Sequence, residues 1–341
     1  MNKKLVTVTI GVALSLPFVA VQAANSGPTV YGKLFAGYQL SDNGVVDQYE
    51  MQTNSSRFGF KGTADLSNGL EGIYQIERGI DITGEDTTIS ARPTYVGLKG
   101  SFGTITAGVQ DTPFKMSQGK ADMFNDVEAE LSGVRDLDLK DVLTSGEIRM
   151  TNSIAYLSPK FSGMEFRLQV APGERSDTTV VTAASEADGP LDQASLSLVY
   201  EQNGFYGAIA YDSEVQSTQG TTIPASGATF LTGRDAVRLT GGATMGAFSG
   251  YVMLEQSELA NVAGADSETG FLVSGSYAIG QTTLKAQVIS SDIRAAGGQQ
   301  VSLGVDQALA KKTRAMAFFS TYKNDADAES DVFGVGVEHS F

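Results

Sequence analysis

Short runs in which apolar and polar residues alternate fill most of this chain, and this period of two constrains the fold more than any other feature. In residues 29–40, for example, Val30, Leu34 and Tyr38 fall on one face and Lys33 falls on the other. Such alternation is typical of a β-strand with one apolar face. Sixteen runs of this kind occur, at residues 29–40, 52–65, 69–82, 90–100, 103–110, 148–158, 163–171, 190–202, 204–213, 234–244, 246–257, 267–278, 281–290, 299–308, 312–323 and 330–341.

The connections between these runs alternate in length. Tight turns occur at residues 66–68, 101–102, 159–162, 203, 245 and 309–311. The intervening connections are long, polar and rich in Asp, Ser, Thr and Gly, at residues 41–51, 83–89, 111–147, 172–189, 214–233, 258–266 and 291–298. Short turns at one rim and long loops at the other are typical of an outer-membrane β-barrel with an even number of strands.

A soluble β-sandwich and a membrane β-barrel differ in where the apolar face points. In a sandwich it points into a core, whereas in a membrane barrel it points to lipid and the polar face lines water. The polar faces here are unusually charged, as at Arg57, Lys61, Glu77 and Lys285. The length of the runs also suits a tilted membrane-spanning strand. We therefore predict an all-β fold, a transmembrane antiparallel β-barrel of sixteen strands.

The first 23 residues have the features of a secretory signal peptide. Lys3 and Lys4 form a positive n-region, residues 5–19 form an apolar core, and residues 21–23 (VQA) form a small-residue cleavage site. We predict that residues 1–23 are removed. Residues 24–341 are then expected to form a single barrel domain, because no linker or change in composition divides them.

The composition excludes several classes of function. The chain has no Cys, which removes disulfide frameworks and thiolate metal sites. His339 is the only histidine, so the usual base of nucleophilic catalysis is missing from most of the chain. The formal net charge of −15 disfavours nucleic acid as a partner. Neither an enzyme activity nor a cofactor or metal site is expected.

Several motifs follow one another along the chain: VYGK at residues 30–33, SSRFGFKGTADLSNGLEGIYQIERG at 55–79, RPTYVGLKGSFGTITAG at 92–108, NSIAYLSPKFSGMEF at 152–166 and VFGVGVEHSF at 332–341. In this order, with the signal peptide and the terminal Phe341, they resemble the Gram-negative general porin family, the trimeric sixteen-stranded diffusion channels. The motifs cover the first half of the chain densely and the last strand. Residues 172–330 match only in their rhythm of strands and loops.

The resemblance implies a location and a set of partners. A member of this family is expected in the outer membrane of a Gram-negative bacterium, exported through the periplasm, as a homotrimer among outer-membrane lipids and lipopolysaccharide. The last strand, which ends at Phe341, resembles the signal read by the outer-membrane insertion machinery. Small hydrophilic solutes and ions are the expected cargo.

The connection at residues 111–147 is the longest, and a loop of this length is usually functional or disordered. The resemblance implies that this third long loop folds into the pore and forms a constriction. Its DMFND segment at residues 122–126 resembles the family's Asp-x-Phe-Gly-Asp motif, with Asn125 in place of the Gly. The acidic side of the constriction is expected to comprise Asp122, Asp126, Glu128 and Glu130.

A basic wall is expected opposite this loop, made of Lys33, Arg57, Lys61, Arg92 and Arg149. Parity with neighbouring apolar residues places Lys33, Arg57 and Arg149 on the polar face. Lys61 is expected slightly off the plane of the constriction. Arg92 shares its parity with Val96 and Leu98, which points it to lipid. The resemblance implies an inward Arg at this position, and we adopt that interpretation.

Together these features predict a passive diffusion channel that filters solutes by size and charge, because charges on opposite sides of a constriction create a transverse field. The net negative charge favours a weak preference for cations. Two alternatives stay open. One is a substrate-selective outer-membrane channel with a binding ladder, and the other is an adhesin or structural protein that uses the barrel only as an anchor.

Overall fold

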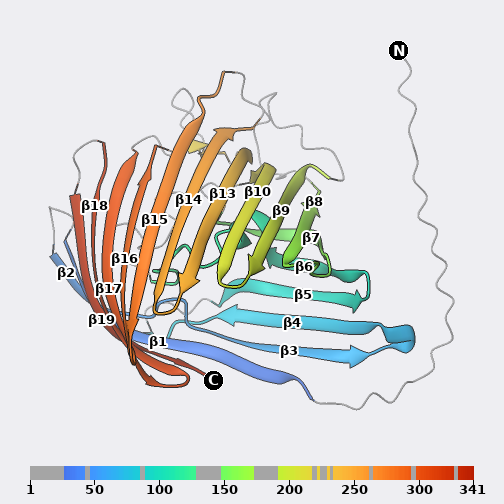
Figure 1. Cartoon of the computed structure of the whole chain (residues 1–341), viewed down its shortest axis with the longest axis horizontal. Coiled ribbons are helices and arrows are strands. Elements are labelled where there is room, and N and C mark those ends of the chain that lie inside the picture. The colour runs from blue at the N-terminus through green and yellow to red at the C-terminus, as the bar shows by residue number, and fades with distance from the viewer. Residues whose placement is uncertain are drawn as a thin grey trace.

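Figure 1 shows a computed structural model of the protein, which describes residues 27–42, 47–84, 89–127, 147–172, 191–216, 221–222, 229–230, 233–260, 264–292, 297–325 and 329–341. The predicted signal peptide and the predicted site residues Glu128 and Glu130 lie outside the described residues. Within the described part of the chain, no helix is long and apolar enough to span a membrane.

The main sheet is antiparallel and contains seventeen strands. They are β1 (Thr29–Asp42), β2 (Asp47–Gln52), β3 (Arg57–Asp65), β4 (Glu71–Gly79), β5 (Ser90–Gly100), β6 (Gly103–Asp111), β7 (Arg149–Leu157), β8 (Met164–Ala171), β9 (Gln193–Gln202), β10 (Phe205–Gln216), β13 (Gly233–Met245), β14 (Phe248–Leu259), β15 (Glu268–Ile279), β16 (Thr282–Ser291), β17 (Gly298–Ala310), β18 (Thr313–Lys323) and β19 (Glu329–Ser340). Two short strands, β11 (Thr221–Thr222) and β12 (Thr229–Phe230), pair only with each other.

The strands β2 and β3 are two halves of one barrel strand, because both pair with β1 and only residues 53–56 separate them. Counting them as one leaves sixteen barrel strands, seventeen minus one. The ring closes where β1 pairs with β19 and where Gly32 and Phe341 exchange two backbone hydrogen bonds, of 3.3 and 3.0 Å. The predicted sixteen-stranded antiparallel barrel is thus confirmed.

The two faces of the barrel have opposite character to those of a soluble protein. On the adjacent strands β14 and β15, Val252, Leu254 and Val273 are 47, 52 and 46% exposed on the outer face. The alternate positions of β14 point inward, where Glu255 is buried. Since lipid solvates apolar side chains and water does not, an exposed apolar outer face fits a barrel in a membrane.

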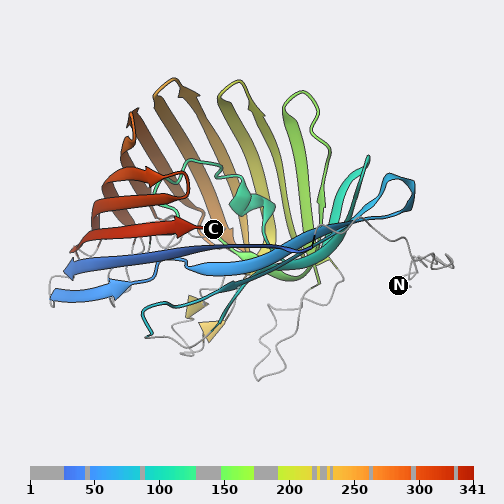
Figure 2. The same ribbon diagram turned by 90° about the horizontal axis from the view of Figure 1, so that it is seen from below.

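Part of the inner face is apolar, which the alternation did not predict. Met253 on β14, Leu272 on β15 and Ile289 on β16 are fully buried and pack in one cluster with Ala121, from the segment after β6. A second cluster joins Phe124 and residues that include Val127 of that segment to strands β1, β18 and β19, at Phe35, Met316, Phe318 and Val332. Figure 2 shows the short helix α1 (Pro113–Met116), which begins this segment, within the curve of the strands.

The orientation of the faces predicts the effect of a charge on the outer one. Val273→Arg should lower the free energy of unfolding by about 2–4 kcal/mol, because it places a guanidinium among acyl chains near the middle of β15. Gln281→Arg, in the exposed turn between β15 and β16, is the matched control and should cost about 0–1 kcal/mol. Denaturant titrations of the barrel in lipid vesicles measure both values. Equal losses for the two variants would contradict the assigned orientation.

Candidate functional site

The loop predicted at residues 111–147 leaves the barrel wall after β6 at a narrow base, which we call the neck. The backbone N–H of Thr112 donates to the carbonyl of Ile148 at 3.2 Å, so the two ends of the predicted loop lie side by side. The Thr112 hydroxyl caps helix α1 by accepting from the N–H of Lys115 at 3.1 Å, and Pro113 suits the first helical position. The N–H of Phe114 donates to the hydroxyl of Ser195 on β9, at 3.0 Å.

From this neck, residues 112–127 follow the inner face of consecutive strands, and we call them the wall-bound segment. The Tyr206 hydroxyl of β10 donates to the carbonyl of Ser117 at 2.9 Å. Ser274 of β15 donates to the carbonyl of Ala121 at 2.6 Å. Lys285 of β16 donates to the carbonyl of residue 123 at 3.0 Å. Each bond satisfies a backbone group that the segment would otherwise leave unpaired away from water.

Gly119 allows a close approach between the segment and Tyr206 of β10. It has φ of +58°, and a Cβ at this position would lie 2.6 Å from the ring of Tyr206. A side chain would therefore meet both backbone strain and a clash with an aromatic ring.

Asp126 ends the described part of the segment and is bonded to two predicted members of the basic wall. Its Oδ2 lies 3.0 Å from the Lys33 Nζ and 2.9 Å from an Arg57 nitrogen. Burial acts to raise the pKa of Asp126, but the charges of Lys33 and Arg57 and their hydrogen bonds outweigh it and hold that pKa well below its usual range. Asp126 is thus a carboxylate bonded directly to the wall.

Arg92 joins the same cluster through Glu77 on β4. Its Nε donates to Glu77 Oε1 at 2.5 Å, and the Arg57 Nε lies 3.8 Å from the same oxygen. The register shifts beside Glu77, where Arg92 and Pro93 together oppose this one residue. This β-bulge reverses the parity of β5, and Pro suits it because Pro cannot donate to the ladder. The bulge explains why parity with Val96 misplaces Arg92 and why it lies on the side of Glu77.

The cluster continues round the wall as an alternating series of charges. Lys33 lies 3.3 Å from Glu338 on β19, and Glu338 lies 3.0 Å from Arg314 on β18. Arg314 lies 2.8 Å from Asp306 on β17, which in turn lies 3.2 Å from Lys285. We call the whole series the charged belt: Arg92, Glu77, Arg57, Asp126, Lys33, Glu338, Arg314, Asp306 and Lys285.

The other predicted site residues take different places. Asp122 accepts from the Gln287 amide at 3.0 Å, on the β16 side of the barrel and apart from Lys33 and Arg57. The Lys61 ammonium lies 5.0 Å from the centre of the Tyr31 ring, and the Tyr31 hydroxyl donates to Glu77 at 2.9 Å. Tyr31 therefore lies between Lys61 and the belt. The structure therefore brings together Asp126, Lys33, Arg57 and Arg92.

Arg149 does not join them, and this corrects the parity argument. It pairs with Asp111 at 3.0 Å. Between Arg149 and Ser153 the register shifts by one residue, so two residues of β7 oppose Val109 alone. As a result Met150 lies in a buried cluster with Ala171, and Arg149, which alternates with it on β7, shares Asp111 with Lys115 of helix α1.

Sequence reasoning missed five members of the belt as site residues: Glu77, Glu338, Arg314, Asp306 and Lys285. The available signal was the charge itself, because ionised side chains in the middle of membrane strands are confined to the inner face. A second signal pointed to the wall-bound segment. The unbroken apolar runs YVML at 251–254 and FLV at 271–273 put an apolar residue on the inner face, where it needs a covering element.

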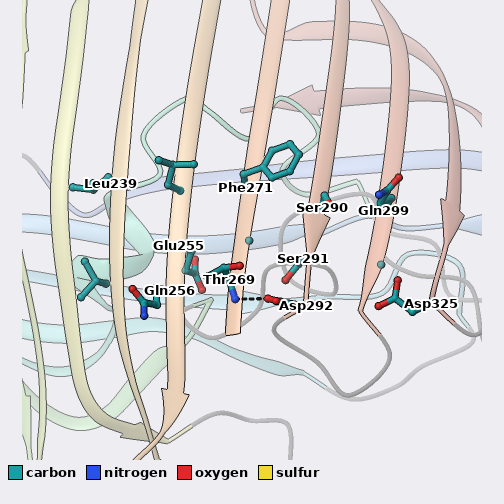
Figure 3. Close-up of a pocket in the computed structure, with 14 residues that line it drawn as sticks. Leu239, Glu255, Gln256, Thr269, Phe271, Ser290, Ser291, Asp292, Gln299 and Asp325 are labelled. Carbon is teal, nitrogen blue, oxygen red and sulfur yellow. Dashed lines mark hydrogen bonds between the residues drawn. The ribbon is translucent and has the colours of Figure 1, made fainter. Parts of the chain in front are cut away.

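A cleft of about 560 Å³ lies elsewhere, over strands β13 to β17. Figure 3 shows Leu239, Phe271 and Asp292 among its lining residues. Leu239 and Phe271 are exposed on the outer face, and the predicted site residues do not line the cleft. The candidate site is therefore the charged belt with the wall-bound segment.

The family model described as Gram-negative porin matches residues 10–327. The chain belongs to the Gram-negative porin family. It is accordingly an outer-membrane barrel rather than an enzyme. The major outer membrane protein P.IB of Neisseria sicca is 26% identical to this porin over 97% of this chain and 99% of that protein. The protein of the same name from Neisseria gonorrhoeae is 29% identical over 58% of this chain, and the match spans only 55%, about half, of that relative's length.

Solved structures share the fold of this porin at low sequence identity. The anion-selective porin from Comamonas acidovorans has a TM-score of 0.76 and 20% identity, with coverage of 92% of this chain and 99% of that one. The trimer form of OmpT from Vibrio cholerae has a TM-score of 0.66 and 16% identity, with the same coverage. Both likenesses concern the barrel architecture.

The depressed pKa of Asp126 leads to a prediction about stability and pH. At about pH 7, Asp126→Asn should lower the free energy of unfolding by about 1–3 kcal/mol, because it removes a charge bonded to two cations. The stabilisation is fully present above 3.8, the ordinary pKa of Asp, and is lost as the pH falls below it. Denaturant titrations of both proteins in vesicles at several pH values measure this difference. A difference that already disappears between about pH 6 and 5 would contradict the assigned ion pairs.

Proposed function

We propose that this porin is a passive diffusion channel for small hydrophilic solutes and ions, narrowed by the wall-bound segment. The observation that carries the proposal is the charged belt on the inner face of a barrel whose outer face is apolar. A sixteen-stranded barrel encloses a wide aqueous lumen, which would sieve small solutes poorly if nothing entered it. A segment bonded along the inner face from β9 to β1, and to Arg57 of β3, reduces that width.

Filtering by charge follows from the make-up of the belt. Five cationic and four anionic side chains alternate along it at ion-pair distances of 2.5 to 3.8 Å, so each charge is largely balanced by its neighbours. Solutes at the narrowing then meet a strong local field but little net charge, and fields from more distant groups are screened beyond about 8–10 Å. The selectivity between ions is therefore weak. The belt itself carries one net positive charge, so the proposed preference for cations rests on the net negative charge of the rest of the chain.

The proposed assembly is a homotrimer in contact with outer-membrane lipids and lipopolysaccharide. The Vibrio OmpT structure is titled as a trimer form, and the exposed apolar face of the barrel gives both lipids and neighbouring copies a surface to cover. Residues 24–341 form the single barrel domain of this assembly after removal of the signal peptide at 1–23.

Single-channel recording in a planar bilayer tests the channel and its filter together. Arg57→Ser should raise the cation-to-anion permeability ratio about two- to fivefold, and Asp126→Asn should lower it by a similar factor, since each changes one charge beside the passage. Expression and trimer formation should be unchanged. Reversal potentials across a salt gradient give the ratios.

Lys99→Gln is the matched control, because Lys99 is exposed near a short turn and, within the described part of the chain, forms an ion pair with Glu71 and with no member of the belt. Its permeability ratio should equal that of the wild type. A folded protein that never conducts would contradict the proposed channel function and support the anchor alternative. Competitive block by one sugar or anion at low concentration would favour the substrate-selective channel.

Phe341 is proposed as the residue by which the insertion machinery reads the last strand. Its backbone pairs with Gly32, and its ring packs over the space that the missing Gly32 side chain leaves. Phe341→Ala should reduce the amount of barrel in the outer membrane several-fold but leave folding in vesicles intact, whereas Phe333→Leu on the same strand should change neither. Equal loss in cells and in vesicles would make Phe341 a stability residue instead.

A further inference from the structure

One arginine of the inner face lies outside the charged belt and is completely buried. Arg238 on β13 has a side-chain exposure of 0%. Its Nε and one terminal nitrogen donate to Glu255, directly opposite on β14, at 2.9 and 2.8 Å. This fork satisfies one side of the guanidinium and leaves the other nitrogen free to bond elsewhere.

The second terminal nitrogen of Arg238 bonds both ends of the predicted loop. It donates to the carbonyl of Phe114, near the start, at 3.2 Å and to Glu147, at the end, at 3.0 Å. The guanidinium also lies 4.3 Å from the centre of the Phe114 ring, which is buried against Ala210 and Ala236. One side chain thus ties residues 33 positions apart to the same point of the wall.

Only an arginine can make this set of contacts. A planar guanidinium offers five N–H groups in a rigid fork and stacks on an aromatic face, whereas a lysine ammonium is a compact charge on a flexible stem. A lysine at position 238 would still balance Glu255 and Glu147, but it could not bond both of them and Phe114 at once.

We propose that Arg238 is the positioning residue that holds the base of the loop against β13 and thereby sets the size limit of the pore. The inference deepens the proposed channel function and rests on it. Arg238 itself is too far buried to meet solutes, so its influence passes through the position of the wall-bound segment. Loss of the fork with retention of the charge should loosen that segment while the barrel wall stays intact.

The experiment compares Arg238→Lys with Arg234→Lys. Arg234 lies two inward-facing positions earlier on the same strand and bonds Ser257 of β14 and Glu268 of β15; among the described residues it makes no hydrogen bond or ion pair with the wall-bound segment. Because the chain has no Cys, Ala121→Cys can be added to each as a reporter at a fully buried site of that segment. The readouts are the rate of modification by a water-soluble maleimide and the largest polymer that enters the open channel.

Arg238→Lys should raise the modification rate at position 121 roughly tenfold, as expected for the loss of one or two hydrogen bonds, and should admit larger polymers with noisier open-channel current. Arg234→Lys should match the parent in modification rate, polymer size limit and current noise. A folded Arg238→Lys barrel with parental modification rate and size limit would overturn the inference. If the parent itself does not conduct, the proposed function fails, while the modification rates still decide whether Arg238 holds the loop.

Discussion

The whole structure depends on the backbone hydrogen bonds that close the sheet. In a bilayer there is no water to satisfy an unpaired strand edge, so a sheet that spans it has to return to its first strand. Here β19 pairs with β1, and Gly32 and Phe341 complete the seam. Closure separates the two faces of every strand, and the alternation of side chains then decides which groups meet lipid and which meet the lumen.

The inner face also has to be covered in part, because it carries apolar side chains and buried charges as well as hydrophilic groups. Apolar side chains such as Met253 and Leu272 would be exposed inside a bare barrel, and charged ones such as Arg238 need partners at low solvent access. The wall-bound segment covers the first group, and its carbonyls and carboxylates pair with the second. The same contacts that stabilise this segment also narrow the lumen in the proposed function, so stability and selectivity share one set of residues.

The fold was largely predictable from the sequence, because the period of two and the alternation of loop lengths are direct consequences of barrel geometry. The candidate site was predictable in part. The loop motif led to Asp126, and parity led to Lys33 and Arg57. Parity failed at Arg92 and Arg149, since each lies beside a β-bulge that adds one residue and exchanges the faces of the strand. The contacts of Asp122 and Arg238 depend on which strands the wall-bound segment passes. The alternation of residues along the chain does not indicate those strands, because they lie far from the segment in the sequence.

Oxygen accessibility of spin labels along β14 tests the orientation of the faces most directly. Oxygen partitions into acyl chains, and the absence of native Cys allows single labels at successive positions. The account predicts high accessibility at Val252 and Leu254 and low accessibility at Met253 and Glu255, in a barrel reconstituted into vesicles. High accessibility at Met253 and Glu255 with low accessibility at Val252 and Leu254 would contradict a barrel that turns its apolar side to lipid. Uniformly low values, as in a dry interior, would contradict it as well.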